Sequence, residues 1–259
     1  MTKAIILAAG QGTRLRPITN DRPKCLVELK GKSLLERQVK TLNSQGIHDI
    51  QVVTGYLSEK IESLGYNTSF NARYKESNMV ESLFSAIEFI KNCNEDLIIG
   101  YGDIIYDEIN LEALMKSESE VSIMIDKEWL ALWSLRLDNP LDDAETLVMD
   151  NEGYITELGK KPENYAQIQG QYTGLIKVKA GKIKDFISFY EDLDREVFYD
   201  NKNFENMYMT SFIQLLINSG WKVKASLVCN GWLEIDSVED LIIYEKLAET
   251  DELNKFISL

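Results

Sequence analysis

The residues best suited to chemistry lie near the start of the chain, where an apolar run leads into two glycines and two basic side chains. Residues 4–9 form the run and predict a buried strand. Gly10 and Gly12 follow at once, and glycine lets backbone N–H groups close around an anion. Arg14 and Lys24 add positive charge. The pattern predicts a loop that binds a triphosphate, although an ordinary tight turn can also require two glycines.

An aspartate at the end of a second apolar run is a candidate metal ligand. Residues 96–106 predict a further buried strand, and Asp103 lies within it directly after a glycine. An acid at the carboxyl end of a parallel strand can cap a turn. It can also hold a hard cation against phosphate oxygens. Because the triphosphate loop is predicted at the same sheet edge, we expect Asp103 to hold the cation.

A partner acid occurs near the end of the chain. Alternation along residues 231–237 predicts a short strand with Glu234 and Asp236 on one face, so Asp236 can point into the same site. The alternative is that Asp236 or Ser237 caps the helix predicted over residues 238–247. Both roles are compatible. We therefore expect Asp103 and Asp236 to share one divalent cation.

Composition excludes several other kinds of chemistry. The formal net charge of −14 argues against a nucleic-acid partner, whose phosphates this surface would repel. Three scattered cysteines without a C-x-x-C pair support neither a disulfide framework nor a zinc site. A single histidine, His48, excludes histidine clusters. No run reaches membrane-spanning length, and the chain enters a strand without an export signal, so we expect a cytoplasmic protein with no membrane partner.

The order of the predicted elements indicates an α/β fold. Apolar residues at helical spacing predict a helix over residues 33–43, and residues 50–56 read as the next buried strand. Strand, helix and strand form the unit of a parallel, doubly wound sheet. Residues 122–127 and 170–178 predict further strands. No linker composition divides the 259 residues, so we expect one domain over 1–259.

The glycine loop also carries a family resemblance. Residues 7–17, together with Pro23 and Lys24, resemble the signature of nucleotidyltransferases, which load sugar 1-phosphates, phosphocholine and related metabolites onto a nucleoside triphosphate. Arg14 replaces the third glycine of a dinucleotide-binding motif, so we expect no nicotinamide cofactor. The resemblance implies a Rossmann-like, mixed but mostly parallel sheet flanked by helices, of the nucleotide-diphospho-sugar transferase type. It implies Mg²⁺ at Asp103, catalytic roles for Arg14 and Lys24, and nucleotide contacts from Leu7, Ala8, Ala9, Gly10, Gly12 and Thr13.

The nucleobase is expected at the start of a helix. Ser77 or Asn78 can cap a helix whose apolar residues recur at helical intervals behind it. In the family that this chain resembles, this helix start lies beside the base. The resemblance therefore implies that Asn78 and Ser82 are candidates for hydrogen bonds to it.

The acceptor side is predicted within residues 126–175 and 196–210. Two tryptophans with nearby basic residues could form a wall for a cationic acceptor and its phosphate, or the tryptophans could simply pack in the core. By resemblance, Lys161 belongs to a Lys-Pro pair that faces the acceptor phosphate and is a third catalytic candidate, although a solvated turn lysine is the alternative. The acceptor-binding candidates are Lys127, Trp129, Trp133, Arg136 and Tyr172, the last on the strand predicted to close the pocket.

The resemblance is most detailed for enzymes that use CTP. Residues 232–237 are similar to phosphocholine-type cytidylyltransferases, and residues 139–146 and 200–210 are similar to the phosphoglutamine type. This implies an Mg²⁺-dependent transfer of CMP from CTP to a phosphorylated metabolite with release of pyrophosphate, and a place in capsule or surface polysaccharide biosynthesis. A sugar-1-phosphate nucleotidyltransferase and a non-catalytic nucleotide-binding regulatory subunit stay open as alternatives. A homo-oligomeric state of the protein also stays open.

Overall fold

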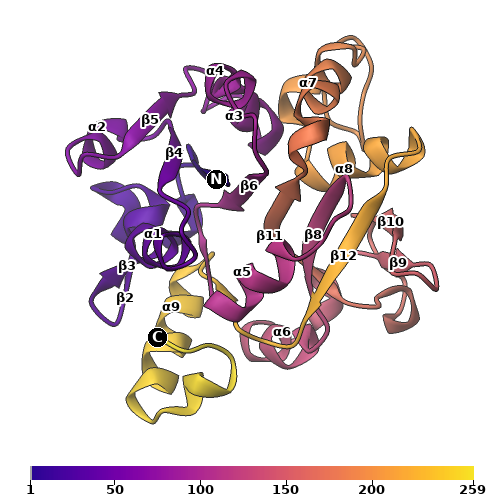
Figure 1. The fold of residues 1–259 in the computed structure, drawn as a ribbon. Helices are drawn as coiled ribbons and strands as arrows, with labels where there is room; N and C mark the ends of the chain where they lie inside the picture. Colours follow the sequence, from indigo (N-terminus) through magenta and orange to yellow (C-terminus); the bar gives the residue numbers. More distant parts are fainter. Residues whose placement is uncertain (1) are drawn as a thin grey trace.

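A mixed sheet of seven strands forms the centre of the computed structural model, which describes residues 2–259 (Figure 1). The strand order is β12-β8-β11-β6-β1-β4-β5. Neighbouring strands are parallel except in the two pairs made by β11. The strands are β1 Lys3–Ala8, β4 Asp49–Thr54, β5 Asn67–Phe70, β6 Leu97–Tyr101, β8 Val121–Asp126, β11 Gln171–Val178 and β12 Val223–Val228. The predicted mixed, mostly parallel α/β sheet is confirmed.

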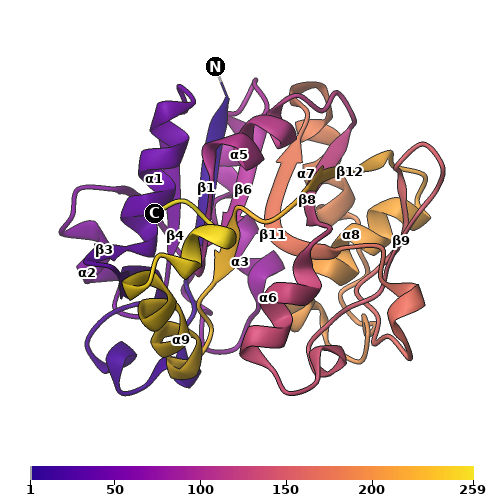
Figure 2. The ribbon, with the colours of Figure 1, turned by 90° about the horizontal axis from the view of Figure 1, so that it is seen from below.

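Helices cover both faces of the sheet. One layer contains α1 Leu34–Ser44, α5 Glu108–Met115, α6 Trp129–Arg136 and α9 Val238–Glu249, which lie in front of the sheet in Figure 2. The other contains α3 Met79–Ser85, α4 Ile87–Lys91, α7 Ile183–Glu191 and α8 Met209–Asn218. The short α2, Ser58–Glu62, lies beside β5. None of the helices within residues 2–259 has the length and apolar character needed to cross a membrane.

Strand β1 is buried on both faces of the sheet, which explains why its sequence is a continuous apolar run. Ala4, Ile6 and Ala8 pack into the hydrophobic cluster on one face of the sheet. Ile5 and Leu7 pack into the cluster on the other face. A strand buried on both sides has no position for an alternating polar residue. The parallel pairing of β1 with β4 through α1 is the predicted strand, helix and strand unit.

The predicted strand over residues 96–106 is wrong in one respect, because it breaks in two. Strand β6 ends at Tyr101, and β7, Ile104–Tyr106, leaves the central sheet and pairs antiparallel with β13, Trp232–Glu234. The break occurs at Gly102, whose N–H donates to the carbonyl oxygen of Leu7 at 2.8 Å. A Cβ at Gly102 would lie 2.6 Å from that oxygen, so only glycine fits there.

Smaller elements complete the fold. Strands β2, Glu28–Leu29, and β3, Lys32–Ser33, form one hairpin. Strands β9, Leu147–Met149, and β10, Ile155–Leu158, form another within the segment predicted to hold the acceptor.

Candidate active site

The glycine loop after β1 is folded against Lys24. Gly12 has a φ of +59°, which glycine adopts without a steric penalty. A Cβ at this position would lie 3.0 Å from Lys24 Cβ and 3.2 Å from Thr19 Cγ2. The Thr19 hydroxyl donates to the Gly12 carbonyl oxygen at 2.7 Å. Thr19 therefore holds the Gly12 backbone in place, and only a residue without a side chain fits without strain at Gly12 beside Lys24, the lysine that was predicted to be catalytic.

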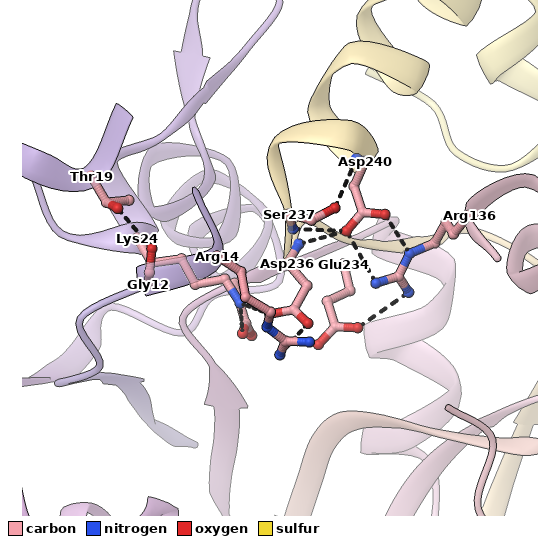
Figure 3. Close-up of polar contacts among 10 residues, drawn as sticks. Gly12, Arg14, Thr19, Lys24, Arg136, Glu234, Asp236, Ser237 and Asp240 are labelled. Atoms are coloured by element: carbon pink, nitrogen blue, oxygen red, sulfur yellow. Dashed lines mark hydrogen bonds and ion pairs between the residues drawn. The ribbon is translucent and has the colours of Figure 1, made fainter. Parts of the chain in front are cut away.

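Lys24 lies between the two aspartates that were predicted from distant parts of the sequence (Figure 3). Its Nζ atom is 2.7 Å from Asp103 Oδ2 and 2.5 Å from Asp236 Oδ1. Arg14 forms a further ion pair with Asp236. Burial alone would lower the pKa of Lys24, but the nearby carboxylates outweigh that effect and raise it. The lysine therefore stays protonated.

The β7–β13 ribbon brings these acids together. Glu234 pairs with Ile104 in its register, and the Ile235 N–H donates to the Asp103 carbonyl oxygen at 3.0 Å. Asp103 and Asp236 therefore flank the end of the same two-stranded ribbon. Ser237 caps α9, so the capping alternative is also correct for this residue. Asp236 reaches the site while the next residue begins the helix.

Glu234 is a third acid of the site, to which the sequence analysis assigned no role. Carboxylate oxygens of Asp103, Glu234 and Asp236 all lie within 4.8 Å of one another. Burial, followed by the charge of Asp103, raises the pKa of Glu234 to about 7, while Arg136 and Lys24 act in the opposite direction. The predicted alternation had placed Glu234 on the same face as Asp236, so the sequence pattern alone could have identified Glu234 as a member of the site.

The three carboxylates fit the requirements of a magnesium ion. Mg²⁺ prefers hard oxygen ligands, and carboxylates are its usual protein ligands. Asp103 Oδ1 is buried and has no hydrogen-bond partner within the described residues, so this oxygen is available to a cation. Asp103, Asp236 and Glu234 are the residues that would hold the ion.

A pocket opens next to this cluster and collects most of the residues predicted to bind the nucleotide. Asn78 caps α3 by accepting a hydrogen bond from the Met79 N–H at 2.8 Å. The Ser82 hydroxyl accepts from Asn71 at 3.0 Å and keeps a proton to donate. Gly12, Thr13 and Arg14 lie in the adjoining loop. The lining includes Leu7, Ala8, Ala9, Gly10, Lys24, Asn78, Ser82 and Asp103.

The two predicted acceptor tryptophans are packing residues in this structure. Trp129 and Trp133 are buried, and the Trp133 ring stacks on Trp232 at 5.7 Å. Tyr172 packs edge to face against Tyr101, whose side chain lines the pocket. Burial favours the core alternative for Trp133, whereas Trp129 also lines a second pocket together with Lys127. Tyr172 is the candidate that packs beside the nucleotide pocket.

The predicted basic acceptor residues are dispersed. Lys161 is exposed, and its Nζ atom donates to the carbonyl oxygens of Leu141 and Asp142, both at 2.6 Å. Lys127 is exposed after β8. Arg136 requires a correction, because its side chain is 5% exposed and its guanidinium pairs with Glu234 and Asp240 instead of facing a free acceptor site.

A glycine loop beside a carboxylate cluster, at the carboxyl edge of a mixed α/β sheet, defines the class of a nucleotidyltransferase. Comparison with known proteins agrees, and the chain belongs to the nucleotidyl transferase family, whose model matches residues 3–131. Over 246 residues it is 47% identical to the CTP:phosphoglutamine cytidylyltransferase of Campylobacter jejuni, covering 92% of this chain and 97% of that protein.

Two further matches, one in sequence and one in structure, are to cytidylyltransferases of Streptococcus pneumoniae. The choline-phosphate cytidylyltransferase is 45% identical over 94 residues, which are 35% of this chain and 41% of the relative. The solved structure of the CTP:phosphocholine cytidylyltransferase superposes with a TM-score of 0.71 at 24% identity, over 95% of this chain and 99% of the other. The second match supports the fold alone.

Proposed function

We propose that the protein transfers CMP from CTP to the phosphate of a small phosphorylated metabolite and releases pyrophosphate. The observation that carries the chemistry is the contact of Lys24 with two of three clustered carboxylates beside the glycine loop. The choice of CTP and of phosphoglutamine as the first acceptor to test rests on the Campylobacter relative, which aligns over nearly the whole chain. Phosphocholine is the second choice.

The reaction requires little covalent chemistry from the protein. A phosphate oxygen of the acceptor attacks the α-phosphorus of CTP, and the bond to the pyrophosphate leaving group breaks. A phosphate monoester is already ionised near neutral pH, so it needs no general base. The protein must align two polyanions and offset their repulsion. Arg14 and Lys24 supply positive charge, and the N–H groups of the glycine loop donate to phosphate oxygens.

The three carboxylates would hold Mg²⁺ in this scheme. When bound, the ion would polarise phosphate oxygens and neutralise the charge that develops on them. Asp103 and Asp236 are the proposed ligands named from the sequence, and the geometry adds Glu234. The Lys24 ammonium contacts two of these acids, so we expect it to shift toward the nucleotide when the cation is present.

The acceptor is assigned to residues 126–175 and 196–210 of a single domain, which lie outside the lining of the nucleotide pocket. Tyr172 supports this assignment because it packs against a residue that lines the pocket. Lys127 and Lys161 stay candidates for the acceptor phosphate, since both are exposed. We keep the predicted cytoplasmic location and the role in surface polysaccharide synthesis as parts of the proposal.

A matrix of substrates tests the function. Purified protein with Mg²⁺ is assayed for pyrophosphate release with each of the four nucleoside triphosphates against phosphoglutamine, phosphocholine and glucose 1-phosphate, and Asp103→Asn serves as the inactive control. We expect turnover with CTP and one of the first two acceptors. Turnover confined to glucose 1-phosphate would establish a sugar nucleotidyltransferase instead. CTP binding without turnover on any acceptor would support a regulatory subunit.

A further inference from the structure

We propose that Arg136 is a positioning residue that orients the acids of the metal site, an inference that rests on the proposed function. Arg136 is the last residue of α6, and its guanidinium makes ion pairs with Asp240 and Glu234 (Figure 3). The arginine and Asp240 side chains are each 5% exposed. The Arg136 guanidinium therefore lies behind the carboxylate cluster and is shielded from solvent.

Arg136 is connected to Asp236 indirectly, through hydrogen bonds of the Asp240 carboxylate. Arg136 Nε is 2.9 Å from Asp240 Oδ1, and Arg136 Nη2 is 3.2 Å from Asp240 Oδ2. This is the two-pronged geometry that a guanidinium offers and an ammonium cannot. Asp240 Oδ2 also accepts the N–H groups of Asp236 and Ser237, both at 2.9 Å. The arginine thus fixes the carboxylate that in turn fixes the backbone of Asp236.

Arg136 is connected to Glu234 directly. Arg136 Nη1 lies 3.3 Å from Glu234 Oε2. Figure 3 shows the Glu234 carboxylate between the Arg136 guanidinium and Asp236. One guanidinium therefore contacts one acid of the cluster and, through Asp240, sets the position of a second. Such outer partners of metal-binding carboxylates typically change metal affinity by about 10–100-fold when they are replaced.

The aromatic residues around Arg136 limit where its guanidinium can lie. Its Cζ atom is 5.6 Å from the centre of the Trp133 ring, and Trp133 stacks on Trp232 of β13. The α6 helix is thereby attached to the strand that carries Glu234. A purely structural role, joining α6 to α9, would explain the same contacts. The two roles differ in their effect on cation affinity.

Arg136→Lys tests the proposal because it keeps a positive charge and removes the two-pronged contact. We measure Mn²⁺ binding by calorimetry in the absence of nucleotide, and the apparent KM for Mg²⁺ separately from kcat. Mn²⁺ affinity is expected to fall about 10-fold or more. The matched control is Lys177→Met, which breaks the buried ion pair of Lys177 with Asp96 at 3.2 Å. It should lower the Tm and leave Mn²⁺ affinity unchanged.

Unchanged Mn²⁺ affinity in Arg136→Lys, together with a lowered Tm, would overturn the positioning role. If that variant does not fold, Asp240→Asn decides the matter, since an asparagine oxygen can still accept the two N–H groups while the ion pair is lost. We expect a smaller loss of Mn²⁺ affinity in this variant, and no loss would overturn the proposal. Failure of the proposed function is distinguishable, because it would appear as absent pyrophosphate release by the unmodified protein.

Discussion

Replacing Lys24 with methionine should destabilise the protein, and divalent cations should reverse the loss. The ammonium of Lys24 lies 2.7 Å and 2.5 Å from two carboxylates, and these three side chains are only 14–15% exposed. Removing one partner of a buried ion pair costs about 3–5 kcal/mol, and the residual exposure favours the lower end. At about 2–4 °C per kcal/mol for a chain of this size, the Tm should fall by about 6–12 °C.

Added Mg²⁺ should raise the Tm of Lys24→Met more than that of the unmodified protein. In the unmodified protein the cation must displace an ammonium from the two aspartates, whereas in the variant it meets uncompensated carboxylates. Thermal unfolding with and without millimolar Mg²⁺ measures both effects. Lys161→Met is the control, because within residues 2–259 that ammonium donates to two carbonyl oxygens and to no carboxylate. Equal Mg²⁺-induced shifts in Lys24→Met and the unmodified protein would refute the reasoning.

Four other substitutions give separate tests. Asp103→Ala or Asp236→Ala should lower kcat by about 10²-fold or more while circular dichroism stays unchanged, because electrostatic stabilisation acts mainly in the transition state; near-normal turnover would remove that residue from the metal site. Glu145→Gln should stabilise the fold by about 1–2 kcal/mol at pH 8 and have little effect below pH 5. Burial, followed by Asp143, raises the pKa of Glu145 to about 7, so its ionisation costs stability as pH rises from about 5 to above 7; a pH-independent difference in Tm would contradict this. Gly12→Ala should weaken CTP binding measured by calorimetry, because φ is +59° and the new Cβ would meet Lys24 at 3.0 Å; unchanged affinity would show that the loop tolerates the strain.

Local signals in the sequence were sufficient to predict the strand, the glycine loop and the helix caps around the proposed nucleotide site. The apolar run of β1 is buried on both faces, and the glycine loop follows it as predicted. Asn78 caps α3, and Ser237 caps α9. Each of these features depends on residues that are close together in the chain, so pattern and capping chemistry reveal them.

Contacts between segments that are distant in the sequence could not be predicted from such local patterns. The break at Gly102 depends on its approach to Leu7 on another strand. The partners of Arg136 lie 98 and 104 residues further along, and the packing of α6 against α9 and against β13 brings them together. A basic residue near two tryptophans resembles an acceptor site in sequence, but the sequence does not reveal that Trp129, Trp133 and Arg136 are buried. Glu234 could have been found, since it shares the alternating face of Asp236.

Diffraction from crystals grown with Mn²⁺ and a non-hydrolysable CTP analogue would test the central claim most directly. The anomalous signal of Mn²⁺ identifies the position of the cation without reference to the surrounding protein. We expect one peak in contact with carboxylate oxygens of Asp103 and Asp236, with the nucleotide phosphates between the ion and the loop at Gly10. A cation bound away from both aspartates, or phosphates that do not contact the glycine loop, would contradict the account.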